Sequence, residues 1–182
     1  MPFAGSGGQR GCQHEPPPPV DPEDRDAAAA MAQRLLAVTD RSRVELQRRL
    51  ERRGYAPETA AEAVARLQAR GWVDDNRLAD ELARRRLSHG YGRRRVVADL
   101  VARGVDAETV NRTAAALGEG QSDAVRLAAD RLRRGHSGPL TDPGEVRRLA
   151  AALQRRGFDM ADIRAVLRQM ATENAAVLPD EG

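Results

Sequence analysis

The sequence predicts an all-α protein made of three tandem three-helix modules that stack into an elongated, bent array. From Ala27 onward apolar residues recur at helical spacing, as at Ile163, Val166 and Met170, and strand-like alternation is nowhere sustained. A similar segment also recurs three times along the chain, which is typical of a repeat protein. The three copies are residues 44–55, 96–105 and 149–158. Helices of about a dozen residues are too short to be stable alone in water, so the modules must stack.

Four glycines mark the ends of predicted helices. Each follows a leucine by four positions and precedes an aromatic residue or a valine. This is the pattern of the Schellman motif, in which the glycine adopts a left-handed conformation and the two apolar side chains meet. The glycines are Gly54, Gly71, Gly104 and Gly157. Their repeated setting predicts a structural role.

The expected helix starts agree with these ends. Ser42 and Glu45 have the spacing of a capping box, and Pro57 and Pro143 suit the first turn of a helix. We therefore expect nine helices, at residues 27–38, 42–53, 57–70, 74–88, 92–103, 107–117, 122–134, 142–156 and 159–173. They group into modules at 27–73, 74–120 and 121–173. An acidic, Pro-rich leader at 1–26 is expected to be disordered, and a tail at 174–182 to be flexible.

The charge balance favours a polyanionic or acidic partner. The chain has thirty arginines, no lysine and 27 acidic residues, a formal net charge of +3. The leader holds two arginines and five acids, so the rest of the chain carries +6. Such a body attracts nucleic acid or an acidic protein surface. The absence of lysine and the abundance of alanine also indicate a general compositional bias, which weakens this inference.

Motifs that would carry chemistry are missing. Without lysine the usual phosphate-binding loop is excluded, and His14, His89 and His136 are too far apart in sequence to suggest a metal site. The single cysteine, Cys12, offers no disulfide framework. We find no signal peptide and no apolar stretch of the roughly 20 residues that cross a bilayer. The sequence therefore predicts a non-catalytic, cytoplasmic protein with no cofactor and no membrane contact.

Arginine clusters are the remaining candidates for a binding site. The densest flanks the turn at 88–92, within twelve residues that contain no acid. Its members are Arg84, Arg85, Arg86, Arg93, Arg94 and Arg95. A second cluster includes Arg41, Arg43, Arg48, Arg49, Arg52 and Arg53, and a third includes Arg147, Arg148, Arg155 and Arg156. These residues either contact phosphates and carboxylates through bidentate forks or form a merely solvated face.

Several segments resemble the RecX family. They are Gly71-Trp-Val-Asp-Asp-Asn-Arg-Leu-Ala79, Gly90-Tyr-Gly-Arg-Arg-Arg95, Leu100-Val-Ala-Arg-Gly-Val105 and Arg41-Ser-Arg-Val-Glu-Leu46. The resemblance covers about 30–172 and includes the threefold repeat. It implies a small regulator of the RecA recombinase that binds in the groove of the RecA–DNA filament, blocks strand exchange and lowers ATP hydrolysis. Leu78 and Leu82 stand where the family often has aromatic residues, which keeps the apolar stripe.

Three functions remain open on the sequence. The first is a monomeric regulator that binds RecA filaments on single-stranded DNA and thereby modulates DNA repair and recombination. The second is a protein that binds DNA directly through helix-turn-helix units. The third is a helical interaction scaffold without any link to DNA. Binding to bare single strands, bare duplex and RecA-coated DNA separates them.

Overall fold

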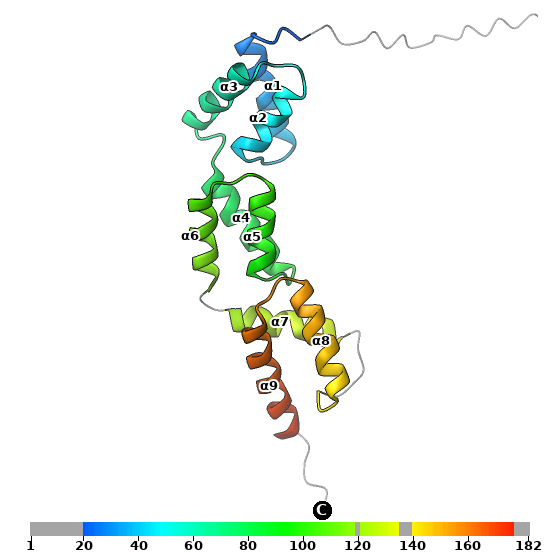
Figure 1. The fold of residues 1–182 in the computed structure, drawn as a ribbon. Helices are drawn as coiled ribbons and strands as arrows, with labels where there is room; N and C mark the ends of the chain where they lie inside the picture. The colour runs from blue at the N-terminus through cyan, green and yellow to red at the C-terminus, as the bar shows by residue number, and fades with distance from the viewer. Residues whose placement is uncertain (1–19, 119–120, 135–139, 177–182) are drawn as a thin grey trace, which may run out of the picture.

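The computed structural model describes residues 20–118, 121–134 and 140–176. These residues form nine helices and no strand, which confirms the predicted class. The helices are α1 (Arg25–Val38), α2 (Arg43–Glu51), α3 (Pro57–Ala69), α4 (Asp75–Ser88), α5 (Arg93–Ala102), α6 (Ala107–Gly118), α7 (Gln121–Arg133), α8 (Pro143–Arg155) and α9 (Met160–Ala176). Three successive helices make each module, and the modules follow one another end to end in an elongated, bent array (Figure 1).

Each module encloses its own apolar core. The described buried apolar residues fall into three clusters, one among α1–α3, one among α4–α6 and one among α7–α9 with the turn before α8. Leu46 and Leu50 of α2, Val96 and Leu100 of α5, and Leu153 of α8 are fully buried in these clusters. The modules therefore fold around separate cores, and short contacts between them set their relative positions.

The predicted glycine-terminated helix ends are confirmed. All four glycines have φ between +71° and +97°, a range that only glycine adopts without strain. At each, the N–H of the next residue donates to the leucine carbonyl five positions back, at 3.0–3.3 Å. A fifth such end occurs at Gly90, where Tyr91 donates to the carbonyl of Arg86 at 3.0 Å. We did not predict it, because an arginine stands where the others have leucine.

The predicted helix starts are also found. Ser42 and Glu45 form the reciprocal hydrogen bonds of a capping box at α2. The carboxylate of Asp142 accepts hydrogen bonds from the first turn of α8, and Asp74 does the same at α4. Pro57 and Pro143 stand in the first turns of α3 and α8. Local sequence therefore determines where these helices begin.

The first module begins earlier than the predicted boundary at residue 26. Asp24 caps α1, whose first residue is Arg25. The carbonyl of Pro22 accepts a hydrogen bond from the N–H of Ala56 at 2.9 Å. Residues 20–26 therefore belong to the first module and cover the turn between α2 and α3. The rest of the predicted leader lies outside the described residues.

A buried aspartate joins the first two modules. The backbone N–H and the Nε of Arg43 donate to the two carboxylate oxygens of Asp75 at 3.0 and 3.2 Å, and Asp75 is 7% exposed. The hydroxyl of Ser42 donates to the carbonyl of Arg103, and the Arg43 guanidinium lies 3.9 Å from the Asp106 carboxylate. The start of α2 is thus held against the end of α5.

The second and third modules meet through the same parts of their helices. The N–H of Gly92 donates to the carbonyl of Arg156 at 2.8 Å. The guanidinium groups of Arg93 and Arg94 contact the carboxylate of Asp159 at 3.2 and 2.7 Å. Here the start of α5 is held against the end of α8. The repeat therefore includes the joints between modules as well as the modules themselves.

Candidate binding surface

The arginine-dense turn between α4 and α5 belongs to a module joint. Arg86 and Arg95 lie 2.6 and 3.2 Å from the carboxylate of Asp99, which is on α5. Arg93 and Arg94 are held at the joint with the third module, as described above. Four of the six predicted arginines therefore have acidic partners within the chain, although residues 84–95 contain no acid themselves.

The ring of Tyr91 contacts three guanidinium groups, two of which belong to this arginine cluster. The guanidinium carbons of Arg86, Arg95 and Arg156 lie 5.4, 5.9 and 5.9 Å from the centre of its ring. Cations at this distance over an aromatic face are stabilised by the ring's quadrupole. Because Arg156 directly follows α8, the tyrosine links the two modules. This turn is thus organised around intramolecular contacts.

Arg84 and Arg85 are the two arginines of this cluster that do not take part in these contacts, and both are exposed. The Nε of Arg84 donates to the backbone carbonyl of Asp80 at 3.3 Å, a contact within α4. Neither arginine has an acidic partner among the described residues. The structure therefore leaves two of the six positions open to a ligand.

The second predicted cluster divides between a joint and a surface. Arg43 is used at the first joint, whereas Arg48 is exposed and has no side-chain partner among the described residues. Arg41 is half-buried, and its Nε has no hydrogen-bond partner among those residues. Burial lowers the pKa of Arg41, and the neighbouring Arg49 and Arg103 lower it further. Positive charge is therefore concentrated near the start and the outer face of α2.

The second helix of every module, taken with the residues directly after it, is strongly basic. Residues 43–53 have five arginines and two glutamates, residues 93–103 four arginines and one aspartate, and residues 143–156 four arginines and one glutamate. Each segment therefore carries a net charge of +3. Within the helix bounds alone, α2, α5 and α8 carry +1, +2 and +2, whereas α3 carries −1 and α6 and α9 carry no net charge. Positive charge thus recurs at the same place in each of the three modules.

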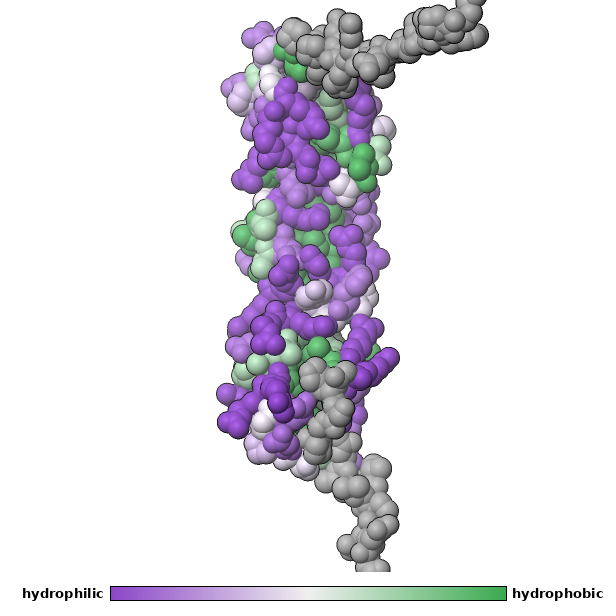
Figure 2. All heavy atoms as spheres, turned by 90° about the vertical axis from the view of Figure 1, so that its right-hand side faces the viewer, coloured by the Kyte–Doolittle hydropathy of each residue, from purple (hydrophilic) through white to green (hydrophobic). Residues whose placement is uncertain are grey.

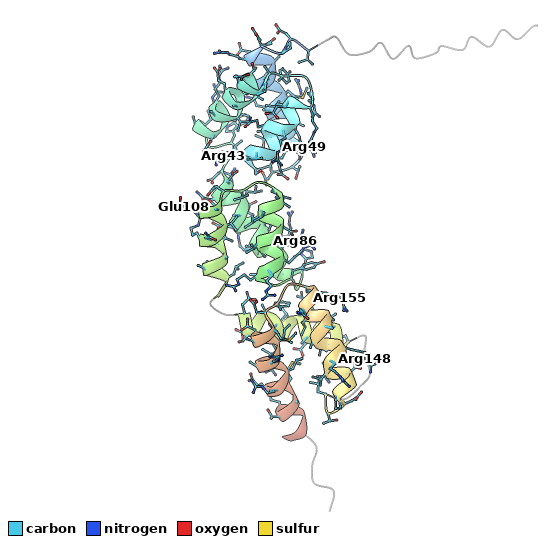
Figure 3. The ribbon with its side chains drawn as sticks, viewed as in Figure 1. Arg43, Arg49, Arg86, Glu108, Arg148 and Arg155 are labelled. Carbon is cyan, nitrogen blue, oxygen red and sulfur yellow. The ribbon has the colours of Figure 1, made fainter. Side chains whose placement is uncertain are left out.

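The basic second helices lie on one side of the array. α2, α5 and α8 occupy its right-hand side in Figure 1, and the view onto that side shows broad hydrophilic areas over the first and third modules (Figure 2). Arg49 and Arg155 lie on this side, whereas Glu108 lies on the opposite one (Figure 3). We call the side formed by residues 43–53, 93–103 and 143–156 the basic ridge.

The arginines of the basic ridge differ in what they contact. Those without an acidic partner among the described residues lie on or directly after α2 and α8, in the two outer modules. They are Arg48, Arg49, Arg52, Arg53, Arg147, Arg155 and Arg156, of which Arg156 contacts the ring of Tyr91. On α5, Arg93, Arg94 and Arg95 are ion-paired, and Arg103 lies 4.0 Å from Glu45. The ridge therefore has open charge in its outer modules and paired charge at its centre.

The three modules match the three domains of one protein family. Residues 28–67 match the first three-helix domain of RecX, residues 74–113 the second and residues 119–167 the third. These matches together cover more than half of the chain. The chain belongs to the RecX family.

Relatives and solved structures agree with this assignment. "Regulatory protein RecX" from Xanthomonas campestris pv. campestris is 40% identical over 136 residues, 74% of this chain and 82% of the relative. The protein of the same name from Stenotrophomonas maltophilia is 42% identical over 136 residues, which are 74% of this chain and 81% of that relative. The crystal structure of RecX from Lactobacillus salivarius has a TM-score of 0.71 at 16% identity, covering 82% of this chain and 97% of that one. The last similarity shows the fold.

Sequence reasoning about this RecX chain missed the acidic partners of its arginines. Asp75, Asp99 and Asp159 come from α4, from α5 and from the turn before α9. Asp75 and Asp159 look like ordinary helix-start residues, and only the stacking of modules brings arginines to them. A usable sign was the recurrence itself, because Arg43 and Arg93 occupy equivalent positions, as do Asp106 and Asp159.

The described part of this RecX chain shows neither a metal-holding cluster nor a membrane-spanning helix. Within it, no group of three or more His, Cys, Asp or Glu side chains is placed to hold a metal ion. No described helix is both long and apolar enough to cross a membrane. His89 contacts the backbone carbonyl of Arg85 at 2.6 Å. Cys12, His14 and His136 lie outside the described residues.

Proposed function

We propose that this chain binds RecA filaments formed on single-stranded DNA and lowers the recombinase and ATPase activities of RecA. In this way it modulates DNA repair and recombination. The observation that carries the proposal is the basic ridge, in which the second helix of every module and the residues directly after it together carry a charge of +3. A nucleoprotein filament presents phosphates and acidic side chains at regular intervals, which a repeated basic surface complements.

The family supports the identity of the partner. RecX relatives are named regulatory proteins, and membership implies action on RecA by binding in the filament groove. An elongated array suits such a groove, because each module reaches a different part of it. The open arginines of α2 and α8 are the strongest candidates for contact, since neutralising exposed arginines against a polyanion releases its counterions.

The charge of the third helices argues against direct reading of DNA. In a helix-turn-helix unit the recognition helix enters the major groove of a polyanion. The corresponding helices here are α3, α6 and α9, which carry −1, zero and zero. A DNA-binding function would therefore have to use a helix other than the one this motif employs.

A pair of charge-reversal variants tests the proposal. Arg48→Glu with Arg52→Glu reverses two exposed, unpaired arginines of the ridge. The matched control is Arg34→Glu with Arg70→Glu, which makes the same charge change on exposed positions of α1 and at the end of α3 in the same module. We expect the ridge variant to need about tenfold more protein for half-inhibition of RecA ATP hydrolysis, while the control stays near the wild type.

Binding measurements complete the test. Wild-type protein should bind RecA-coated single strands more tightly than bare single strands or bare duplex, and this binding should weaken as salt concentration rises. Equal loss in both variants would show that net charge alone matters and would remove the ridge from the proposal. Tighter binding to bare duplex than to the filament would favour the direct DNA-binding alternative. No binding to any of the three would favour the scaffold.

A further inference from the structure

The third module has an apolar groove on its surface between α8 and α9. Its volume is about 700 Å³. The floor is formed by Ile163 and Leu167, which are 0% and 4% exposed. The walls are partly buried apolar residues of both helices. They are Val146, Ala150, Ala151, Met160 and Ala171. Helix α7 packs against both helices in the same core, so the groove lies on the side that α7 does not cover.

Small side chains keep this groove open. Three of the wall residues are alanines, so α8 and α9 approach each other without filling the space between their outer faces. The larger Val146 and Met160 bound it at the end where α8 begins and the end where α9 begins. Apolar grooves of this size on a protein surface are typical of sites for ligands or partner segments.

Three arginines surround the apolar lining. Arg147 of α8 and Arg164 and Arg168 of α9 line the groove, and all three are exposed. The Nε atoms of Arg147 and Arg168 donate to backbone carbonyls of their own helices, at 3.1 and 3.2 Å. No acidic side chain pairs with any of the three in the part of the chain that the structure describes. The rim is therefore positively charged.

The two α9 arginines distinguish this module from the others. With the helix-ending glycines Gly54, Gly104 and Gly157 as the common reference, Arg164 and Arg168 correspond to Ala61 and Ala65 in the first module and to Asn111 and Ala115 in the second. By the same reference, the floor residues Ile163 and Leu167 correspond to Ala60 and Val64 in the first module and to Val110 and Ala114 in the second. The third module thus combines larger apolar residues on the floor with positive charge on the α9 side. Neither the general repeat nor the basic ridge requires this combination, because α9 lies outside the ridge.

We propose that the groove binds an amphipathic helix of a protein partner whose apolar stripe is flanked by acidic residues. From Val146 to Gln154, the lining of α8 spans nine residues, about 12 Å along the helix axis. Anchors at positions i, i+4 and i+7 of a bound helix span about 10.5 Å, so two to three apolar side chains fit along the groove. Carboxylates beside that stripe reach Arg147 on one side and Arg164 and Arg168 on the other.

A designed peptide tests the site without RecA or DNA, so its result is independent of the proposed function. The probe is a fluorescein-labelled 18-residue helix with leucines at i, i+4, i+7 and i+11 and glutamates beside them, measured by anisotropy against the full chain. We expect Arg164→Glu with Arg168→Glu to weaken binding about tenfold, because two favourable charge contacts become repulsive. The same change at Arg48 and Arg52 should leave binding unaltered.

Two further variants separate the groove from general charge attraction. Ala151→Phe fills the groove without changing charge and should abolish peptide binding. Arg164→Lys with Arg168→Lys keeps the charge and should retain most of it, and circular dichroism checks that each variant folds. Binding that survives Ala151→Phe, or that falls equally with the Arg48 and Arg52 reversal, overturns the proposal. A large gain in affinity on deleting residues 177–182 also overturns it, because the chain's own tail would then be the occupant.

Discussion

Arg43 and Asp75 connect the first two modules through two hydrogen bonds to one carboxylate. The backbone N–H and the Nε of Arg43 donate to different oxygens of Asp75. The carboxylate is buried and stands in the first turn of α4, beside the capping residue Asp74. One side chain thus fixes the start of α2 against the start of α4, and the joint depends on it.

Replacing Asp75 by alanine should therefore loosen the joint. The backbone N–H of Arg43 would lose its acceptor in a partly buried place, which costs about 1–2 kcal/mol of unfolding free energy. Urea denaturation measures the loss. Asp80→Ala is the matched control on the same helix. Asp80 is exposed and its contact with Arg112, at 4.0 Å, is long, so this substitution should change stability by less than about 0.5 kcal/mol. Equal effects of the two substitutions would contradict the role of Asp75.

Two glycines with the same backbone conformation should respond differently to alanine. Gly71 has φ +72°, and a Cβ atom added there would have no neighbouring atom within 4 Å. Gly71→Ala should therefore lower the free energy of unfolding only through the strain of the left-handed backbone, by about 1 kcal/mol. Gly104 has φ +71°, but a Cβ there would lie 2.7 Å from Cγ1 of Val44 across the joint. Gly104→Ala should cost about 1 kcal/mol more, and Gly104→Val more again. Similar denaturation midpoints for the two alanine variants would show that the joint yields freely.

The sequence predicted the helices well because their boundaries are encoded locally. The leucine, glycine and apolar residue that end a helix lie within six positions of one another, and the capping box at Ser42 spans four. Such patterns can be recognised without knowing the fold. Their repetition at three places also predicted the modular architecture. Gly90 escaped notice because Arg86 replaces the expected leucine and contacts Tyr91 through its charge instead.

The candidate site was harder to predict because it depends on contacts between distant residues. Arg94 and Asp159 are 65 positions apart, and Arg43 and Asp75 are 32. A window around the turn at 88–92 contains six arginines and no acid, yet the fold supplies Asp99 and Asp159. Which arginines remain open is therefore decided by stacking of the modules. Within the basic ridge the unpaired arginines lie on or directly after α2 and α8, because those of α5 are paired at the joint or with Asp99.

Truncation should reveal the difference between residues 1–19 and residues 20–26. Removing 1–19 should leave the melting temperature nearly unchanged, as we expect of a segment rich in proline and glycine. Removing residues 1–26 also deletes the cap Asp24 and the carbonyl of Pro22 that accepts the N–H of Ala56. That larger truncation should cost about 1–2 kcal/mol. Thermal unfolding of the two forms compares them, and identical melting temperatures would show that residues 20–26 add nothing to the first module.

The arginine-dense turn is the place where sequence and structure suggest different experiments. From sequence alone, reversing Arg93, Arg94 and Arg95 to glutamate tests contact with a filament. In the structure, the same change also breaks the ion pairs with Asp99 and Asp159. A loss of inhibition would then have two explanations, since the joint and the interface would be changed together.

Single alanine substitutions on either side of one ion pair separate these explanations. Arg94→Ala and Asp159→Ala both remove the contact of 2.7 Å between Nε and carboxylate. Because the Arg94 side chain is 64% exposed, we expect Arg94→Ala to cost no more than about 1 kcal/mol. Asp159→Ala should cost more, because it also removes the contact of Arg93 at 3.2 Å, and the double variant should cost less than the sum. If Arg94 serves the joint, both single variants should weaken inhibition of RecA ATP hydrolysis slightly.

Contact with the filament would give the opposite pattern. Asp159→Ala would free Arg94 for phosphates or acidic side chains, so inhibition would be kept or strengthened, while Arg94→Ala alone would weaken it. We expect the pattern of a joint residue, in which both single variants weaken inhibition slightly. We also expect Arg48→Ala, on the open part of the ridge, to weaken inhibition more than Arg94→Ala does. Titrations of ATP hydrolysis at two salt concentrations compare the three variants, because a lost phosphate contact reduces the dependence of binding on salt. A larger effect at Arg94 than at Arg48 would place the interface at the turn.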